Sequence, residues 1–301
     1  MYHEVLGDRE QIDAWTVVKE SDFRRQMEYL SRHFKVVSLG EALRLMEDSR
    51  DIGEKIAVVT FDDGYSGNRR CVLPIIEAYG IPITIFISTA SIQNQSLYWW
   101  DRLIIALQPG RVGRVAIDLE EFKLGAYRFD PSIRGERRWT VIQSLLTDLK
   151  AISPEMREKA VSSALNQLDI PEQSSSEYLS TLSANEVKEL GNSHFVTIGA
   201  HSHCHNILTQ LDRDAVWESI EKSKRLLETW TDRLVSYFAY PNGDYNENVV
   251  DILRKTGFVC AMTTISRSWK AGDSMFAIPR IGVGRYDSFD LFKAKVWGIW
   301  P

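Results

Sequence analysis

Short apolar runs rich in β-branched residues alternate with longer amphipathic stretches along this chain. The apolar runs predict five strands, at Ile56–Phe61, Ile83–Ser88, Phe195–Ala200, Val235–Tyr240 and Phe258–Thr263. Between and after the later runs, Asp212–Trp230 and Asn246–Thr256 have helical periodicity, and Asp212 is a typical helix-capping residue. Strands that alternate with helices predict a parallel sheet with crossover helices. We therefore expect an α/β fold, specifically a distorted (β/α) barrel if the sheet closes.

The stretch from about residue 92 to about residue 190 interrupts this alternation. It carries the pair Trp99-Trp100 and then mainly helical patterns over Glu136–Asn166. We expect a largely helical insertion that packs beside the barrel and does not form a separate unit. The predicted organisation is thus a single domain over residues 1–301, because α/β barrels of this size are commonly one domain.

Composition and charge exclude several functional classes. The 301 residues are 44% hydrophobic and 26% charged, with a formal net charge of -5. This balance argues against nucleic acid or an anionic membrane as the main partner, and no apolar run is long enough to span a bilayer.

The three cysteines Cys71, Cys204 and Cys260 disfavour a disulfide framework. We expect a cytoplasmic protein; an extracytoplasmic location remains open if the natural chain starts upstream. The oligomeric state is not predicted.

Two adjacent carboxylates end the first of these strands. Asp62 and Asp63 follow Phe61 directly, and Gly64 permits a tight turn after them. Two carboxylates held this close are not both comfortably ionised unless a cation lies between them or one binds a proton. One metal ligand and one general base is a natural division of roles, although paired surface carboxylates are the simpler alternative.

A histidine-rich segment ends the third strand. His201, His203 and His205 account for half of the six histidines in the chain. Imidazole is the commonest metal ligand in proteins. His201 and His205 could converge on one ion if the chain turns helically, while a pairing of His203 with His205 stays open. Two histidines and one carboxylate, with a position left for water, form a known catalytic zinc pattern.

These motifs closely resemble those of the polysaccharide deacetylases, the NodB-homology group of carbohydrate esterase family 4. The T-F-D-D-G motif matches at Thr60–Gly64, and H-S-x-x-H matches at His201–His205. Looser matches are the Tyr2-His3 start, Phe238–Gly243 and Ile278–Ile281. Family members remove N-acetyl groups, or less often O-acetyl groups, from sugars on a distorted (β/α) barrel.

The resemblance implies a set of roles. Asp63, His201 and His205 would be the metal ligands. Asp62 would be the general base, and a backbone N–H near Asn242 would stabilise the oxyanion. The metal would be a divalent ion, most often zinc, with cobalt or nickel as alternatives.

The chain departs from the usual family pattern at two places. The segment Phe238–Gly243 lacks the expected arginine, so we expect Arg280 to orient Asp62 instead, although a structural ion pair is the alternative. No Leu-x-His motif occurs near the C-terminus. His3 could supply the general acid, as in the permuted poly-N-acetylglucosamine deacetylases that begin with Tyr-His; a histidine at a frayed terminus is the alternative.

Several of the nine tryptophans offer flat faces for a sugar ring. Trp99, Trp100 and Trp269 are the candidates for sugar stacking. Three further tryptophans lie in helical patterns and are expected to be core residues, namely Trp139, Trp217 and Trp230.

The expected function is metal-dependent hydrolysis of N-acetyl groups on amino sugars of a glycan or its precursor. An O-acetyl esterase or a non-sugar amide hydrolase on the same scaffold is the first alternative. A non-catalytic glycan-binding protein is the second, and the intact Asp62, Asp63, His201 and His205 argue against it.

Overall fold

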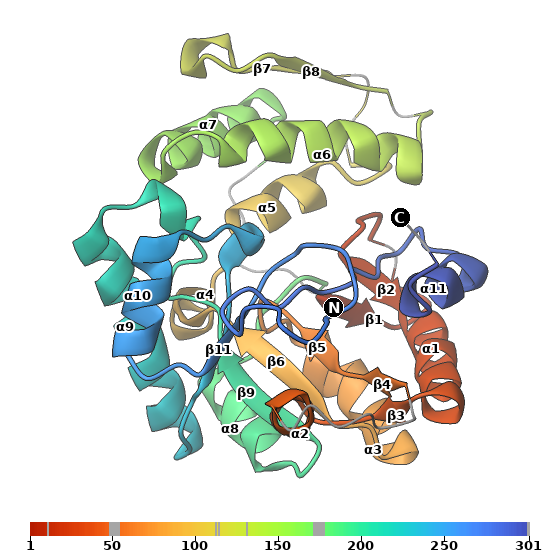
Figure 1. Ribbon diagram of the computed structural model, residues 1–301. Coiled ribbons are helices and arrows are strands. Elements are labelled where there is room, and N and C mark those ends of the chain that lie inside the picture. Colours follow the sequence, from red (N-terminus) through yellow and green to blue (C-terminus); the bar gives the residue numbers. More distant parts are fainter. Residues whose placement is uncertain are drawn as a thin grey trace.

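A five-stranded parallel sheet forms the centre of the molecule. The computed structural model describes residues 1–10, 12–47, 55–111, 113, 115–130, 132–170 and 178–299. The sheet has the order β11-β10-β9-β6-β5 (Figure 1). Its strands are β5 (Val59–Phe61), β6 (Ile83–Ile87), β9 (Val196–Ala200), β10 (Tyr237–Ala239) and β11 (Cys260–Met262). Helices surround it, and this arrangement confirms the predicted barrel-like α/β fold.

The first predicted strand is split between two sheets. Its beginning forms β4 (Ile56–Ala57), which pairs in parallel with β3 (Lys35–Val36). Its end is β5, which pairs in parallel with β6. Residues from Val59 onward therefore reach the central sheet, and the carboxylates that follow Phe61 lie at its carboxyl edge.

Most helices pack around the sheet and bury one apolar face each. They are α1 (Glu20–His33), α2 (Leu39–Glu47), α3 (Leu73–Tyr79), α8 (Ala184–Asn192), α9 (Arg213–Thr231), α10 (Glu247–Lys255) and α11 (Phe289–Val296). The Asp212 side chain caps α9 by accepting a hydrogen bond from the backbone N–H of Ala215 at 2.9 Å. The Asn246 side chain caps α10 in the same way.

The prediction that Trp217 is a core residue is wrong. Its side chain is 42% exposed, although its neighbour Val216 on α9 is fully buried. Successive residues of a helix point about 100° apart, so a residue beside the buried stripe can face solvent. Trp139 is buried and Trp230 packs partly buried against the core, as expected.

The sheet does not close into a full barrel through strand pairing among the described residues. The edge of β5 is bordered by the N-terminal segment: Tyr2 donates its backbone N–H to the Thr60 carbonyl at 2.8 Å, and Asp62 donates to the Tyr2 carbonyl at 3.0 Å. That segment continues into β1 (Glu4–Leu6), which pairs with β2 (Val17–Lys19). At the opposite edge, Ile278 forms a bridge with Met262 of β11. Residues near both ends of the chain therefore border the gap between the two edge strands, β5 and β11. We call this gap the seam of the sheet.

The insertion forms a layer on the carboxyl side of the sheet (Figure 1). It follows α4 (Thr89–Asn94) and contains α5 (Trp99–Ala106), the antiparallel pair β7 (Val115–Asp118) and β8 (Ala126–Phe129), α6 (Glu136–Lys150) and α7 (Pro154–Gln167). Its core also includes Leu6, Val17 and Tyr65 from the N-terminal part of the chain. The range predicted for the insertion also covers α8, whose buried residues belong to the core of the sheet.

No helix among the described residues combines the length and apolar character needed to cross a membrane.

Candidate active site

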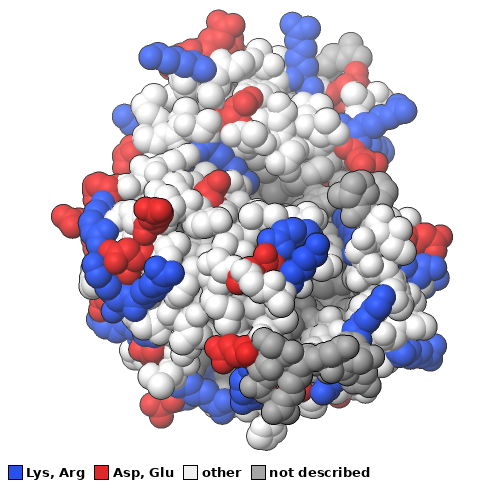
Figure 2. Space-filling model, viewed as in Figure 1, with Lys and Arg blue, Asp and Glu red and all other residues white. Residues whose placement is uncertain are grey.

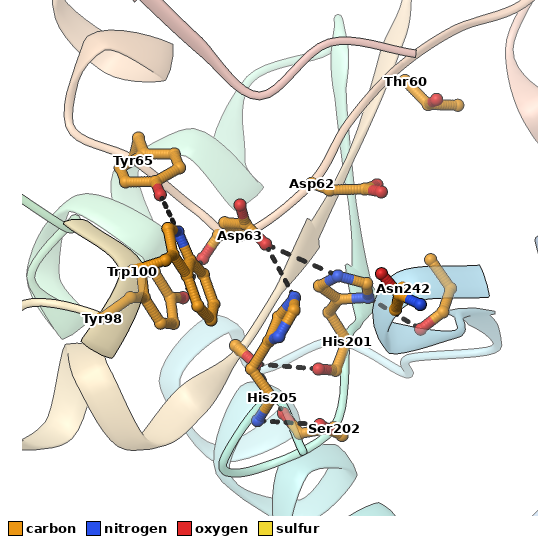
Figure 3. Close-up of polar contacts among 12 residues, drawn as sticks. Thr60, Asp62, Asp63, Tyr65, Tyr98, Trp100, His201, Ser202, His205 and Asn242 are labelled. Carbon is orange, nitrogen blue, oxygen red and sulfur yellow. Dashed lines mark hydrogen bonds and ion pairs between the residues drawn. The ribbon is translucent and has the colours of Figure 1, made fainter. Parts of the chain in front are cut away.

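The candidate site lies where three parallel strands end. Asp62 and Asp63 follow β5, His201 follows β9, and Asn242 lies in the short turn after β10. Carboxyl ends of parallel strands share one edge of a sheet, which is where sites form in barrel folds. Figure 3 shows Asp63, His201 and His205 pointing toward one another, with Asp62 and Asn242 nearby and Tyr98 and Trp100 beside His205.

A tight turn aims Asp63 at this centre. Asp63 has a φ of 75° and Gly64 has a φ of 81°. A Cβ atom on Gly64 would also lie 3.3 Å from the Ile87 side chain. Only glycine adopts such a conformation at no steric cost, so Gly64 allows the chain to reverse immediately after the two carboxylates.

A second tight turn brings two of the three clustered histidines to Asp63. The Ser88 hydroxyl donates to the His201 carbonyl at 2.8 Å, and the His205 backbone N–H donates to Ser202 Oγ at 3.1 Å. His203 turns away, because its Nδ1 lies 2.8 Å from the Thr89 hydroxyl. The structure therefore brings together His201 and His205 and leaves His203 outside the cluster.

The three converging side chains have the donor set of a metal site. Asp63 Oδ1 lies 3.1 Å from His205 Nε2 and 3.5 Å from His201 Nε2. One ligand atom from each of these residues lies within 4.8 Å of the other two. His201 Nδ1 is 2.7 Å from the Ala239 carbonyl, which only accepts hydrogen bonds, so Nδ1 carries the proton and Nε2 is free to bind a metal.

The charge balance of this cluster favours a cation. Asp63 Oδ1 is buried and accepts no hydrogen bond of ordinary geometry from the described residues. Burial lowers the pKa of His201, but the Asp63 and Asp62 carboxylates raise it more, so that it lies above its ordinary value. A buried carboxylate oxygen facing two imidazole nitrogens requires a proton or a metal ion between them. The residues therefore fit a divalent metal ion.

Asp62 lies beside this cluster and contacts Arg280. Arg280 donates from Nη1 to Asp62 Oδ1 at 2.6 Å and from Nη2 to Oδ2 at 2.7 Å. Arg280 Nε also donates to the Thr263 carbonyl at 3.0 Å, which anchors the guanidinium at the end of β11. Burial raises the pKa of Asp62, but the charge of Arg280 outweighs this and keeps the pKa below its ordinary value. Asp62 is thus held ionised.

His3 reaches the same region from the N-terminal segment. The Asn68 side-chain amide donates to the His3 carbonyl at 2.9 Å and fixes its backbone. The buried Nδ1 of His3 has no hydrogen-bond partner among the described residues. Burial lowers the pKa of His3, although the charges of Asp63 and Asp62 oppose this. An imidazole with an unpartnered buried nitrogen therefore lies within the electrostatic reach of both aspartates.

Asn242 lies at the rim of the site in a left-handed conformation, with a φ of 61°. Its Oδ1 accepts a hydrogen bond from Lys150 Nζ at 2.8 Å, and its Nδ2 donates to Asp244. Lys150 is the last residue of α6, so the insertion supplies a cation at the rim. Sequence reasoning missed Lys150, because nothing in the helical pattern of α6 indicates what its end approaches.

Two of the candidate sugar-stacking tryptophans are engaged with protein rings. The Trp100 ring stacks on Tyr98, with a centroid distance of 4.4 Å, and lies 4.5 Å from the His205 ring. Trp99 packs edge-on against Trp100. Trp269 packs partly buried against the small core around β10 and β11. Tyr98 was not singled out from the sequence, where it is one aromatic residue among many.

The carboxyl edge of this parallel α/β sheet thus carries a buried Asp-His-His cluster that could hold a metal ion, next to a buried Asp-Arg pair. The family model for polysaccharide deacetylase matches residues 49–118 and 155–261 of this chain. The match covers more than half of the sequence, so the chain belongs to the polysaccharide deacetylase family.

Individual relatives agree with this assignment over nearly the whole chain. A Bacillus subtilis (strain 168) protein, YxkH, provisionally described as a polysaccharide deacetylase, is 19% identical over 280 residues, which cover 93% of this chain and 70% of YxkH. The structure of IcaB from Ammonifex degensii matches with a TM-score of 0.61 and 18% identity over 98% of this chain and 94% of that chain. A de-N-acetylase from Aggregatibacter actinomycetemcomitans matches with a TM-score of 0.60 and 14% identity over 98% of this chain and 97% of that chain. At these identities the two structures establish a shared fold.

Proposed function

We propose that this protein is a divalent-metal-dependent hydrolase that removes N-acetyl groups from N-acetylated amino sugars of a polysaccharide or glycan precursor. The observation that carries the proposal is the convergence of Asp63, His201 and His205 beside the buried Asp62–Arg280 pair. Membership of the polysaccharide deacetylase family supports an acetylated glycan as the substrate. The de-N-acetylase among the similar structures makes an N-acetyl group the first choice.

Asp63, His201 and His205 would hold the metal, most often zinc, with cobalt or nickel as alternatives. When bound, such an ion lowers the pKa of water and polarises the acetyl carbonyl. His201 is already oriented for ligation, because its Nδ1–H donates to the Ala239 carbonyl. Asp63 is held by its turn with one oxygen directed at both imidazoles.

Asp62 would act as the general base. It accepts a proton from the attacking water as the new C–O bond forms at the acetyl carbon. Arg280 uses one lone pair on each carboxylate oxygen, and each oxygen retains another for this proton. The arginine also keeps the carboxylate ionised and fixes its orientation, so the base is ready before substrate binds.

His3 and Asn242 would complete the reaction. Negative charge develops on the acetyl oxygen in the transition state, and a backbone N–H at Asn242 would donate to it. The C–N bond then breaks, and His3 would donate a proton to the leaving nitrogen. The products are acetate and a free amino sugar. The proton that His3 delivers would be replaced by the one that Asp62 takes from the attacking water, so that no proton is gained or lost by the protein over the cycle.

The surface of the protein is consistent with an uncharged or mixed-charge glycan as the partner. Figure 2 shows acidic and basic side chains interspersed over this face, without a large area of one sign. This agrees with the net charge of -5 in arguing against nucleic acid.

Cys71, Cys204 and Cys260 are unpaired, which supports a reducing, cytoplasmic setting.

Acetate release from N-acetylglucosamine oligomers tests the proposal. The protein would be assayed as purified, after removal of metal by a chelator, and after zinc or cobalt is added back. We expect acetate release that chelation abolishes and metal restores. An O-acetylated sugar and a simple aryl acetamide, assayed in parallel, distinguish the ester and non-sugar alternatives. Bound metal without acetate from any acetylated sugar would overturn the proposed substrate, and activity that survives complete metal removal would overturn the mechanism.

A further inference from the structure

The two candidate metal-ligand turns contain backbone conformations that are unfavourable for the residues in them. Asp63 has a φ of 75° and His205 has a φ of 54°. For residues other than glycine, such conformations cost on the order of 1–3 kcal/mol each and persist only where the surroundings enforce them. The question is therefore which contacts hold Asp63 and His205 in place.

Tyr98 holds the backbone of Asp63. Its hydroxyl donates a hydrogen bond to the Asp63 carbonyl oxygen at 2.7 Å. Tyr98 is the residue just before α5, is only 4% exposed, and belongs to the insertion rather than to the sheet. The bond thus ties the turn after β5 to a rigid element 35 residues away in sequence.

Trp100 packs against the imidazole of His205. The centroids of the two rings are 4.5 Å apart, and the Tyr98 ring also meets His205 edge-on at 5.8 Å. Trp100 and Tyr98 stack almost in parallel, with an angle of 7° between their planes. The two aromatic rings therefore form one wall beside His205, as Figure 3 shows.

A buried hydrogen-bond chain fixes this wall from behind. Trp100 Nε1 donates to the Tyr65 hydroxyl at 3.0 Å, and that hydroxyl donates to Asp101 Oδ2 at 2.8 Å. Tyr65 and Asp101 are essentially inaccessible to solvent. Tyr65 follows Gly64 in the same turn as Asp63. The hydrogen-bond chain behind Trp100 is therefore anchored in the turn that carries Asp63.

We propose that Tyr98 and Trp100 are positioning residues that hold Asp63 and His205 in ligand geometry before a metal binds. The inference rests on the proposed function, because it takes Asp63 and His205 as ligands. Neither aromatic residue donates an electron pair to the ion. Their effect is to remove the cost of ordering the two turns at the moment of binding. The insertion thereby contributes directly to the metal centre.

Metal affinity tests this role without reference to catalysis. Tyr98→Phe removes only the hydroxyl that binds the Asp63 carbonyl, and Trp100→Phe removes the indole N–H and half of the ring face. Loss of residues that support metal ligands typically lowers affinity about 10- to 100-fold. We expect a decrease of that size in zinc affinity for both variants, measured by competition with a chromogenic chelator at fixed pH.

Tyr127→Phe is the matched control. Tyr127 is a buried tyrosine of the same insertion, and its hydroxyl donates to Asp148 at 2.6 Å, away from the metal cluster. It should lose a comparable hydrogen bond and leave zinc affinity unchanged. Tyr65→Phe, which interrupts the hydrogen-bond chain behind Trp100, serves as the second test if Tyr98→Phe or Trp100→Phe fails to fold.

The outcomes separate this inference from the proposed function. If the parent protein binds zinc and Tyr98→Phe and Trp100→Phe bind it equally well, the positioning role is wrong even if the parent releases acetate. If the variants bind zinc more weakly than Tyr127→Phe, the role is supported even if no acetylated sugar is a substrate. A parent protein that binds no zinc, cobalt or nickel overturns both.

Discussion

Arg280 binds Asp62 through two parallel hydrogen bonds of 2.6 and 2.7 Å, although the residues are 218 positions apart. The pair is almost completely buried, with Asp62 3% and Arg280 6% exposed. A buried bidentate pair of this kind fixes the orientation of the carboxylate and its ionisation together. This is the contact that the sequence led us to expect between Arg280 and Asp62.

Arg280→Gln should destabilise the protein by about 3–5 kcal/mol, because it leaves the Asp62 charge buried without its partner. It should also raise the pKa of Asp62 and weaken activity near neutral pH. Urea unfolding and the pH dependence of acetate release measure the two effects. Arg267→Gln is the control, since Arg267 pairs with Asp273 at the surface. Equal stability of the two variants would contradict the prediction.

Asp62→Asn should keep the metal and lose turnover by about 10²- to 10⁴-fold, because it removes the proposed general base and none of the three proposed ligands. His201→Ala should lose both, because it removes a ligand. His203→Ala is the matched control, since His203 contacts Thr89 and not Asp63. Metal content by elemental analysis and acetate release distinguish the three. Undiminished activity of Asp62→Asn would overturn the proposed mechanism.

Glu4→Gln should change how stability depends on pH. Burial raises the pKa of Glu4 from 4.5 to about 8. The folded state therefore holds a proton that the unfolded state releases above pH 4.5. Stability from this group is complete below that value and falls as pH rises toward about 8, by at most about 1.4 kcal/mol per pH unit. Glutamine mimics the protonated acid and avoids this loss.

The free energy of unfolding of Glu4→Gln and of the parent, measured by urea at intervals from pH 5 to pH 8, tests this. The free energy of unfolding of the variant, relative to that of the parent, should increase steadily as pH rises. A difference that stays constant over that range would show that Glu4 titrates normally.

Gly67→Ala should destabilise the fold by about 1–3 kcal/mol through overpacking. A Cβ atom on Gly67 would lie 2.0 Å from Glu4 Oε1 and 2.2 Å from the Val5 carbonyl oxygen. Gly125→Ala is the control, because nothing lies within 4 Å of a Cβ atom there. Thermal unfolding of both variants gives the comparison, and an unchanged melting temperature for Gly67→Ala would contradict the packing described.

The central sheet and the ends of its strands were predictable because both depend on local sequence. Apolar runs define β5 and β9, and polar residues must follow where each strand reaches the edge of the sheet. Asp62, Asp63, His201 and His205 could therefore be placed together. The single domain over residues 1–301, with its insertion at about 92–190, stays a prediction.

Other features depend on contacts that local sequence does not encode. The split of Ile56–Phe61 into β4 and β5 follows from the position of β3. Trp217 is exposed because it lies one residue beyond the buried face of α9. The approach of Tyr98 and Trp100 to the ligand turns, and of Lys150 to Asn242, depends on how the insertion folds back over the sheet. Composition indicates aromatic residues and helices there, without indicating which atoms they meet.

The position of Arg280 at the seam of the sheet sets an order in which the site can be assembled during synthesis. Asp63, His201 and His205 all precede it in the chain, and so do Tyr98 and Trp100. A nascent chain could thus capture a metal while Asp62 still lacks its partner. If the proposed function holds, hydrolytic competence would arrive only when the segment after β11, which is synthesised after all three proposed ligands, folds back onto β5 and pairs Arg280 with Asp62.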